Sequence, residues 1–193
     1  MRTKEKIIEA GTRCFASNGY KETTMAEIAR LVGIKKPSLY AHYQNKEALF
    51  LDVFENEIEC YLQFVQHRIS EKRAQPVKEQ LKDLFFVHSI NEENEISTRF
   101  YYRFVNYPPA ELQEAILTRY KQADDSLFSI LENVWNDGKE LGEIDRNLSS
   151  AHLYHAFFAL IDGLANEMSL YDYVQMKKRA GLVWEVFWRG IKA

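Results

Sequence analysis

The spacing of proline is the feature that most restricts the fold of this chain. Its 193 residues contain four prolines, at Pro37, Pro76, Pro108 and Pro109. Proline is excluded from helix interiors, so the long stretches between these positions are free to form helices. No stretch alternates apolar and polar residues between turn-forming pairs, as a half-buried strand would. The sequence therefore predicts an all-α protein without strands.

Apolar residues recur at helical spacing along most of the chain. Asn18-Gly19 is typical of a helix end, and Thr24 with Glu27 is typical of a helix start. Asn45 is suited to cap a further helix. We expect helices over about residues 3–17, 24–32, 36–43, 46–70, 76–90, 94–106, 109–136, 149–170 and 172–190.

Composition excludes several classes of protein. With 46% apolar and 27% charged residues, the chain can bury a substantial core and is not generally disordered. It has no apolar run near the ~18 residues that span a bilayer, and no secretion signal at its start. Cys14 and Cys60 give neither a disulfide framework nor a CxxC zinc pair. We expect a cytoplasmic protein that does not contact membranes.

Charge divides the chain into two parts. Residues 1–46 hold nine Lys or Arg against four Asp or Glu, a balance of +5. Residues 47–193 hold sixteen against twenty-four, a balance of −8, together with 22 of the 26 aromatic residues. A basic head on an acidic body indicates that the head binds a polyanion.

The predicted helices 24–32 and 36–43 are joined by a turn at Gly33 and form a helix-turn-helix pair. In such a pair the second helix lies in the DNA major groove. Spacing and charge alone leave open a plain helical hairpin inside a bundle. Leu39 is expected to face inward, and the outward side chains of the second helix are polar or amphipathic: Lys36, Ser38, Tyr40 and His42.

Residues 33–49, GIKKPSLYAHYQNKEAL, resemble the recognition segment of the TetR family of bacterial transcription regulators. The resemblance covers about residues 4–54. The remainder is similar to the family in size and helical layout, and weakly at residues 160–164. Upstream residues match the same pattern in order and spacing: Ala10, Phe15, Gly19, Tyr20, Thr23, Thr24, Ile28 and Ala29.

The resemblance implies a homodimeric regulator, typically a repressor, that leaves a near-palindromic double-stranded DNA operator when a small effector binds. It also implies a DNA-binding domain at 1–46 and an effector-binding and dimerisation domain at 47–193, linked by helix 46–70. Thr24 and Lys46 would each bind a phosphate. His42 and Tyr43 would contact phosphate or brace the helix, and the residues facing bases or the flanking backbone would be Lys36, Pro37, Ser38 and Tyr40.

Lys35 departs from the family pattern, which usually has serine or threonine at this helix start. A lysine cannot accept the unpaired backbone N–H, so a cap worth about 1 kcal/mol is absent. It also places a second cation beside Lys36. We therefore include Lys35 in the predicted DNA-binding surface.

The last two predicted helices, 149–170 and 172–190, carry apolar residues on more than one side. Each should therefore be covered on two sides, and a second copy of the chain would supply the additional cover. The family pairs its last two helices in this way, although a plain core role in a monomer stays open. The interface prediction comprises Phe157, Ile161, Leu164, Ala180, Trp184, Phe187 and Trp188.

Aromatic residues are concentrated in the three predicted helices between residues 76 and 136. Bulky rings with a few polar groups can line an apolar cavity, and the family implies a pocket here for an apolar or aromatic effector. For any single ring, a plain core role stays open. The predicted pocket residues are Phe86, His88, Phe100, Tyr101, Arg103, Phe104, Tyr107, Tyr120 and Phe128.

Motifs of catalysis are missing from the sequence. It contains no phosphate-binding glycine loop, no GxSxG and no HExxH. His152 and His155 have a spacing that a metal could use, but spacing identifies no third ligand, so we interpret them as structural. We expect no metal, no cofactor and no enzyme activity. A DNA-bound protein that acts through protein partners is the alternative to a ligand-responsive regulator, and a helical-bundle enzyme is the third hypothesis.

Overall fold

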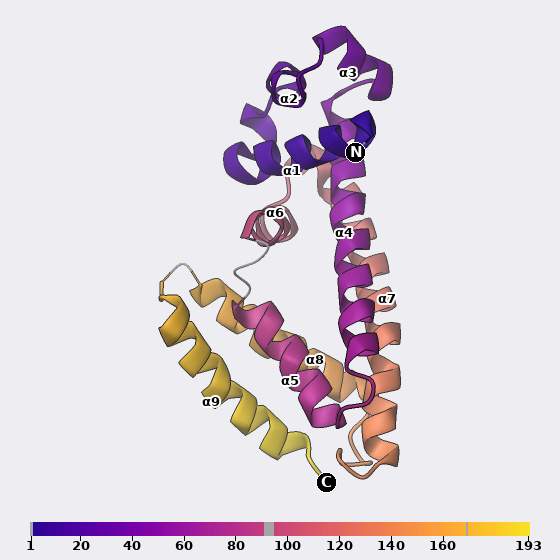
Figure 1. Ribbon diagram of the computed structural model, residues 1–193, viewed down its shortest axis with the longest axis vertical. Helices are drawn as coiled ribbons and strands as arrows, with labels where there is room; N and C mark the ends of the chain where they lie inside the picture. The colour runs from indigo at the N-terminus through magenta and orange to yellow at the C-terminus, as the bar shows by residue number, and fades with distance from the viewer. Residues whose placement is uncertain (1, 91–94, 169) are drawn as a thin grey trace. The chain divides into compact units, whose positions relative to one another are not determined.

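Helices make up nearly all the regular structure of this protein (Figure 1). The computed structural model describes residues 2–90, 95–168 and 170–193. Within these residues the all-α prediction is confirmed, and the β pairing there is an isolated bridge between Ile144 and Lys192. The elements are α1 (Thr3–Glu22), α2 (Met25–Val32), α3 (Lys36–His42), α4 (Lys46–Glu71), α5 (Val77–Ile90), α6 (Glu95–Asn106), a 3-10 turn (Ala110–Leu112), α7 (Gln113–Glu140), α8 (Ser150–Glu167) and α9 (Tyr173–Ile191).

Two helices continue through a glycine at which, or next to which, they were predicted to end. α1 was expected to end near Ser17, but it continues to Glu22 through a kink at Gly19, whose φ of 81° and ψ of 177° are not helical. α7 was expected to end near Asn136, but it continues through Gly138 to Glu140, and the bare Cα of Gly138 leaves room for Ile144. A Cβ at Gly138 would lie 2.6 Å from Ile144 Cδ1. None of the described helices combines the length and apolar character needed to cross a bilayer.

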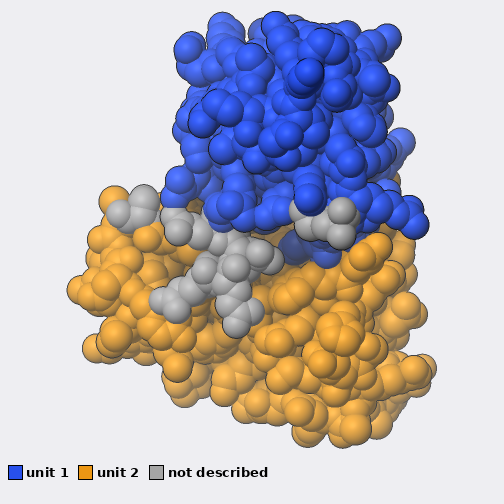
Figure 2. All heavy atoms as spheres, turned by 45° about the horizontal axis from the view of Figure 1, so that its top comes forward, with its two compact units in different colours: residues 1–62, 93–124 blue, residues 63–92, 125–193 orange. Residues whose placement is uncertain are grey.

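The chain divides into two compact units, coloured separately in Figure 2. Unit 1 comprises residues 1–62 and 93–124, and unit 2 comprises residues 63–92 and 125–193. α4 and α7 each contribute one part to each unit. The predicted division at residue 46 therefore does not coincide with the compact units, because unit 1 adds α6 and parts of α4 and α7 to the helix-turn-helix. As a division of function, that boundary stays a prediction.

Phenylalanine rings hold unit 1 together. Phe50 in α4 is fully buried, and its ring lies 5.1 Å from that of Phe15 in α1. It also lies 5.8 Å from Phe100 and 4.8 Å from Phe104, both in α6. Such edge and tilted ring pairs add to the stability gained by burial. α6 thus belongs to the same hydrophobic core as the amino-terminal helices.

Unit 2 is built around large rings from α5, α7, α8 and α9. Phe85 lies 5.7 Å from Phe157 and 5.5 Å from Trp184, and Trp135 lies 5.5 Å from Phe157. All four side chains are at most 3% exposed. They fix α8 and α9 against α5, so one apolar side of each of these helices is buried within a single chain.

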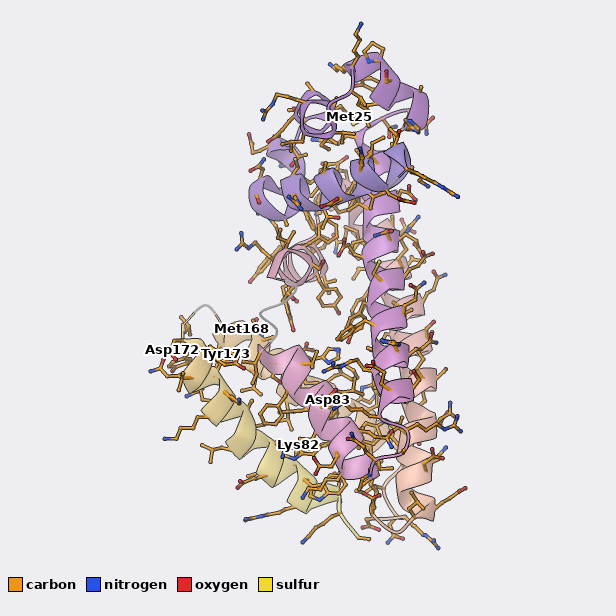
Figure 3. The ribbon with its side chains drawn as sticks, in the orientation of Figure 1. Met25, Lys82, Asp83, Met168, Asp172 and Tyr173 are labelled. Carbon is orange, nitrogen blue, oxygen red and sulfur yellow. The ribbon has the colours of Figure 1, made fainter. Side chains whose placement is uncertain are left out.

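Side-chain caps begin three helices of unit 2. Asp172, labelled in Figure 3, accepts a 2.9 Å hydrogen bond from the Gln175 N–H at the start of α9. Glu143 accepts 3.0 Å bonds from the Val77 and Lys78 N–H groups at the start of α5. Ser149 caps α8 by accepting a 3.2 Å bond from the His152 N–H, and the His152 Nδ1 returns toward the Ser149 N–H at 3.3 Å. His152 thus takes part in capping α8. No group of three or more potential metal ligands occurs in the described part of the chain.

Candidate nucleic-acid interface

A left-handed glycine joins α2 to α3. Gly33 has φ 77° and ψ 28°, and its N–H donates to the Arg30 carbonyl at 3.2 Å. The Ile34 N–H donates to the Ala29 carbonyl at 2.9 Å, which completes the helix-end motif. A Cβ at position 33 would meet no atom within 4 Å, so it is the positive φ that favours glycine here. The turn directs fully buried Leu39 of α3 into the core of unit 1.

The outer surface of α3 carries most of the predicted base-contacting residues. Tyr40 is 44% exposed, and the Lys36 ammonium lies 5.8 Å from the centre of its ring. Lys35 begins the helix without a side-chain cap, as the sequence predicted, and α3 has no acidic residue in its first turn. The start of α3 is therefore positively charged. All the predicted DNA-binding residues of α3 and its cap are exposed: Lys35, Lys36, Pro37, Ser38, Tyr40 and His42.

Thr24 is the N-cap of α2. Its hydroxyl oxygen accepts a 3.2 Å hydrogen bond from the Glu27 N–H, and the residue is exposed. The Glu27 carboxylate does not bond back to the Thr24 N–H; it accepts a 3.1 Å bond from the Asn18 amide. Helix starts attract anions through unpaired N–H groups and the helix dipole. Thr24 thus lies where the resemblance places a phosphate contact.

Tyr43 braces α3 from within the protein. Its ring is 7% exposed, and its hydroxyl donates to the Asp52 carboxylate, which also pairs with the Lys4 ammonium at 2.9 Å. Burial and this hydrogen bond raise the pKa of Tyr43. Burial alone would raise the pKa of Asp52, but the bonds from Tyr43 and Lys4 hold it below its usual value. Of the two roles predicted for Tyr43, the geometry favours bracing.

Lys46 occupies a different environment from the one predicted. Its ammonium donates to the carbonyls of Tyr20 at 2.7 Å, Lys21 at 3.1 Å and Thr23 at 3.1 Å. It also lies 4.5 Å from the centre of the Tyr20 ring. An ammonium has three protons, and these acceptors engage all of them. In this geometry Lys46 ties the start of α4 to the end of α1, and its binding of a phosphate stays a prediction.

The predicted effector-pocket residues fall in both units. Phe100 and Phe104 are buried in the core of unit 1, and the Tyr101 ring lies 6.4 Å from that of Tyr120 in α7. Tyr107 is 81% exposed. The rings of Phe100 and Phe104 thus have a core role in unit 1, and Tyr107 is not enclosed by that unit.

Arg103 has a role that the sequence analysis missed. Its guanidinium donates to the carbonyls of Ala16 at 3.1 Å and Ser17 at 3.2 Å, in α1. These residues are more than 80 positions away in the sequence, so no local pattern could indicate the contact. These contacts tie α6 to α1, and a pocket role for Arg103 stays a prediction.

In unit 2, three of the predicted pocket residues lie in α5 and α7. The His88 ring lies 6.3 Å from Phe64 and 6.5 Å from Phe158, and its Nδ1 is 2.6 Å from the Leu84 carbonyl. Burial lowers the pKa of His88 and so favours the neutral ring. Phe128 lies 5.2 Å from Tyr154, which lies 4.7 Å from Phe158. Phe86 packs against Phe85 at 6.2 Å.

The predicted dimer residues face the inside of unit 2. Trp184 and Phe187 contact each other at 5.8 Å, and Phe187 contacts Phe157 at 5.7 Å. Trp188 is partly buried and stacks on Trp184 at 5.8 Å. The other predicted interface residues are at most 6% exposed within one chain: Phe157, Ile161, Leu164, Ala180, Trp184 and Phe187. This side of α8 and α9 is therefore covered within one chain, and contact of these residues with a second copy stays a prediction.

The opposite side of α9 is uncovered in the single chain. Val174, Leu182 and Val186 are 74%, 58% and 72% exposed and follow one another at multiples of four residues. α8, which packs against α9, exposes the small residues Ala159 and Gly163. The protomer core thus covers one side of α9, and these apolar side chains lie on the side that it leaves exposed.

Comparison with known proteins gives the same assignment for the amino-terminal helices. The family model described as "Bacterial regulatory proteins, tetR family" matches residues 7–53. The chain is 28% identical over 189 residues to the uncharacterized HTH-type transcriptional regulator YerO of Bacillus subtilis, covering 84% of this chain and 65% of YerO. It is 31% identical over 127 residues to the HTH-type transcriptional regulator QacR of Staphylococcus aureus, covering 63% of this chain and 56% of QacR. These relatives are named as regulators rather than enzymes, as expected of this chain.

Solved structures share the whole fold. The fatty acid degradation regulator FadR of Bacillus halodurans matches with a TM-score of 0.75 at 20% identity, over 97% of this chain and 95% of that one. A TetR transcription regulator from Haloarcula marismortui matches with a TM-score of 0.81 at 19% identity, over 99% and 98% of the two chains. At these identities the matches establish the arrangement of helices.

Proposed function

Since this chain is a DNA-binding transcription regulator of the TetR family, we propose that it works as a homodimeric repressor in the cytoplasm. In this proposal it occupies a near-palindromic operator until a small apolar or aromatic effector binds. The observation that carries the proposal is the exposed, basic surface of α3, presented by a helix-turn-helix with a left-handed turn at Gly33.

The proposed DNA surface comprises Thr24 and the exposed residues of α3. A symmetric dimer presents this surface twice, so the two half-sites should lie about one helical turn, roughly 34–36 Å, or a multiple apart. The test is to select duplexes from random-sequence DNA with the purified protein and to map the bound site by footprinting. Selection of an inverted repeat with that spacing supports the proposal, and enrichment of no sequence contradicts it.

The proposed dimer surface is the uncovered side of α8 and α9. Leu182 and Val186 lie at its centre on α9, and Ala159 and Gly163 on α8 permit close approach of a second copy. Placing a charge in a closely packed interface is strongly destabilising. Leu182→Glu should therefore give monomers in analytical ultracentrifugation. Leu141→Glu is the matched control, because Leu141 is 70% exposed outside these two helices. If both variants sediment as the wild type does, the proposed surface is wrong.

The proposed effector site is the cluster of aromatic side chains around His88 in unit 2. Phe64, Tyr154 and Phe158 join Phe128 and His88 in a series of ring contacts from four helices. A neutral imidazole among apolar rings suits an apolar or aromatic ligand better than an anion. The crystal structure of FadR from Bacillus subtilis contains stearoyl-CoA, so a regulator of this fold can hold a long acyl chain. Displacement of a fluorescent apolar dye by a panel of lipophilic compounds tests the site.

A regulator that acts through protein partners is the alternative. The two are distinguished by adding the best dye-displacing compound to the protein–DNA complex. Release of DNA by that compound favours the ligand-responsive repressor. If no compound in the panel displaces the dye or releases DNA, the protein-partner hypothesis gains.

A further inference from the structure

Three side chains from different parts of unit 1 donate hydrogen bonds to the backbone carbonyls around the kink in α1. The Thr23 hydroxyl lies 2.7 Å from the Gly19 carbonyl and 3.1 Å from the Cys14 carbonyl. The Lys46 ammonium donates to the carbonyls of residues 20, 21 and 23, as described above. Arg103 takes those of Ala16 and Ser17. A helix interruption leaves carbonyls without their usual partners, and these groups satisfy them.

Gly19 and Arg103 are fitted to each other. A Cβ on Gly19 would lie 2.8 Å from Arg103 Nη2, 3.1 Å from its Cζ and 3.3 Å from its Nε. The guanidinium therefore lies directly against the backbone of the kink. The φ of 81° and ψ of 177° at Gly19 belong to a region open essentially to glycine alone. Glycine at this position thus permits both the kink and the close approach of the arginine.

The part of α6 that carries Arg103 is held in the core of unit 1. Phe100 and Phe104, on either side of it in α6, are at most 2% exposed and pack on Phe50. Other arginines of unit 1 pair with carboxylates, such as Arg13 with Glu9 at 2.6 Å and Arg119 with Glu55 at 3.1 Å. The contacts of Arg103 within the described residues are instead with backbone carbonyls, which a charged donor binds about twice as strongly as a neutral one.

The kink determines where α2 begins. Thr23 is fully buried, and Thr24 next to it is the exposed N-cap of α2. Few residues separate Gly19 from Thr24, and the carbonyls on both sides of the kink are held. A shift of the kink must therefore move the start of α2 and its exposed hydroxyl.

We propose that Arg103 is a positioning residue for DNA binding. It holds the Gly19 kink of α1 in the geometry that places Thr24 and the start of α2 for a phosphate contact. This inference rests on the proposed function, because Arg103 can position Thr24 for DNA only if Thr24 belongs to the DNA-binding surface. It differs from a merely structural role, in which operator affinity would fall only together with the stability of the whole chain.

The test compares Arg103→Ala with Arg13→Ala in the full-length protein. Both variants lose one positive charge from unit 1, but Arg13 contacts Glu9 of its own helix rather than the kink. The probe is a duplex selected from random-sequence DNA by the wild type. Two quantities are measured: affinity for that duplex, and amide hydrogen exchange of the DNA-free protein over residues 18–28 and over α8 and α9.

Removing the Arg103 guanidinium should populate misplaced orientations of α2, and affinity falls in proportion to the competent fraction. We expect Arg103→Ala to bind about tenfold more weakly, the scale set by the loss of a charge-assisted hydrogen bond. Exchange should quicken over residues 18–28 and stay unchanged in α8 and α9. Arg13→Ala should bind within about threefold of the wild type, the scale of a surface ion pair.

Three results would overturn the inference. In the first, Arg103→Ala binds the duplex as tightly as the wild type. In the second, protection falls equally in residues 18–28 and in α8 and α9, which marks a general loss of stability. In the third, Arg13→Ala weakens binding as much, which marks a charge effect. If Arg103→Ala does not fold, Arg103→Gln, which keeps one amide donor, is judged by the same criteria. Failure of the wild type to select any duplex would instead refute the proposed function, while the exchange data still report on the kink.

Discussion

Replacing Lys46 by methionine removes the ammonium and keeps most of the apolar stem. Three carbonyls, of residues 20, 21 and 23, then lose a charged donor, and the Tyr20 ring loses a cation at 4.5 Å. A hydrogen bond to a charged group is worth about 1.5–3 kcal/mol. The three bonds share one partly exposed ammonium and are not additive, so we expect a loss of about 2–3 kcal/mol in the stability of unit 1.

Thermal unfolding and a salt titration of DNA affinity together test this reasoning. For a chain of this size, a loss of about 2–3 kcal/mol lowers Tm by about 5–10 °C. The dependence of affinity on salt should keep its slope, because that slope counts the phosphates neutralised. Lys36→Met is the control. Its ammonium lies on the exposed surface of α3, so its removal should reduce the slope by about 1 for each phosphate that it neutralises and leave Tm within about 2 °C.

The opposite pattern would refute this reasoning. If Lys46→Met flattened the salt dependence and left Tm unchanged, the ammonium would exchange its carbonyl partners for a phosphate when DNA binds. The resemblance to the family would then have predicted the role of Lys46 correctly, and the geometry of the DNA-free chain would have misled.

Other substitutions probe single contacts. Replacing Tyr40 or Ser38 should change base preference at a cost of about 1–3 kcal/mol on the preferred duplex, with little change on scrambled DNA, in competition binding. Gly33→Ala should lower stability by about 1–2 kcal/mol, because nothing but its positive φ opposes a side chain, and Gly33→Asn should cost less in the same denaturant titration. The lowered pKa of Asp52 means that its contribution to stability is complete above about pH 4 and is lost as the pH falls through the folded-state pKa. Asp52→Asn should therefore remove part of the fall in Tm that occurs below about pH 4.

Local signals predicted the helices and the motif well. Proline spacing, the glycine turn at Gly33 and the caps at Thr24 and Asn45 act within a few residues of sequence, and the structure contains each of them. The kink at Gly19 was missed because Asn18-Gly19 reads locally as a helix end. The side chains that bind the carbonyls before and after it, Arg103 and Lys46, lie far along the sequence.

Side-chain partners across long separations limited prediction of the site. The sequence identifies Lys46 and Arg103 as cations but gives no measure of which acceptors lie near them. In this fold both donate to backbone carbonyls at the end of α1, contacts that no local sequence pattern could indicate.

The side of α9 that we propose for contact with a second copy could not be chosen from composition. Its two apolar sides differ in size: Trp184 and Phe187 lie on one, and Leu182 and Val186 on the other. Choosing the larger rings for the interface assumed that the greatest apolar area is left for the partner. Within one chain, Phe85 and Phe157 already surround those rings, and burying the largest side chains there stabilises each protomer before association. The smaller aliphatic side, flanked by Ala159 and Gly163 of α8, remains uncovered and leaves two helix pairs room to approach closely.

Leu182→Glu should therefore affect association far more than the folding of the protomer, whereas Trp184→Ala should do the reverse.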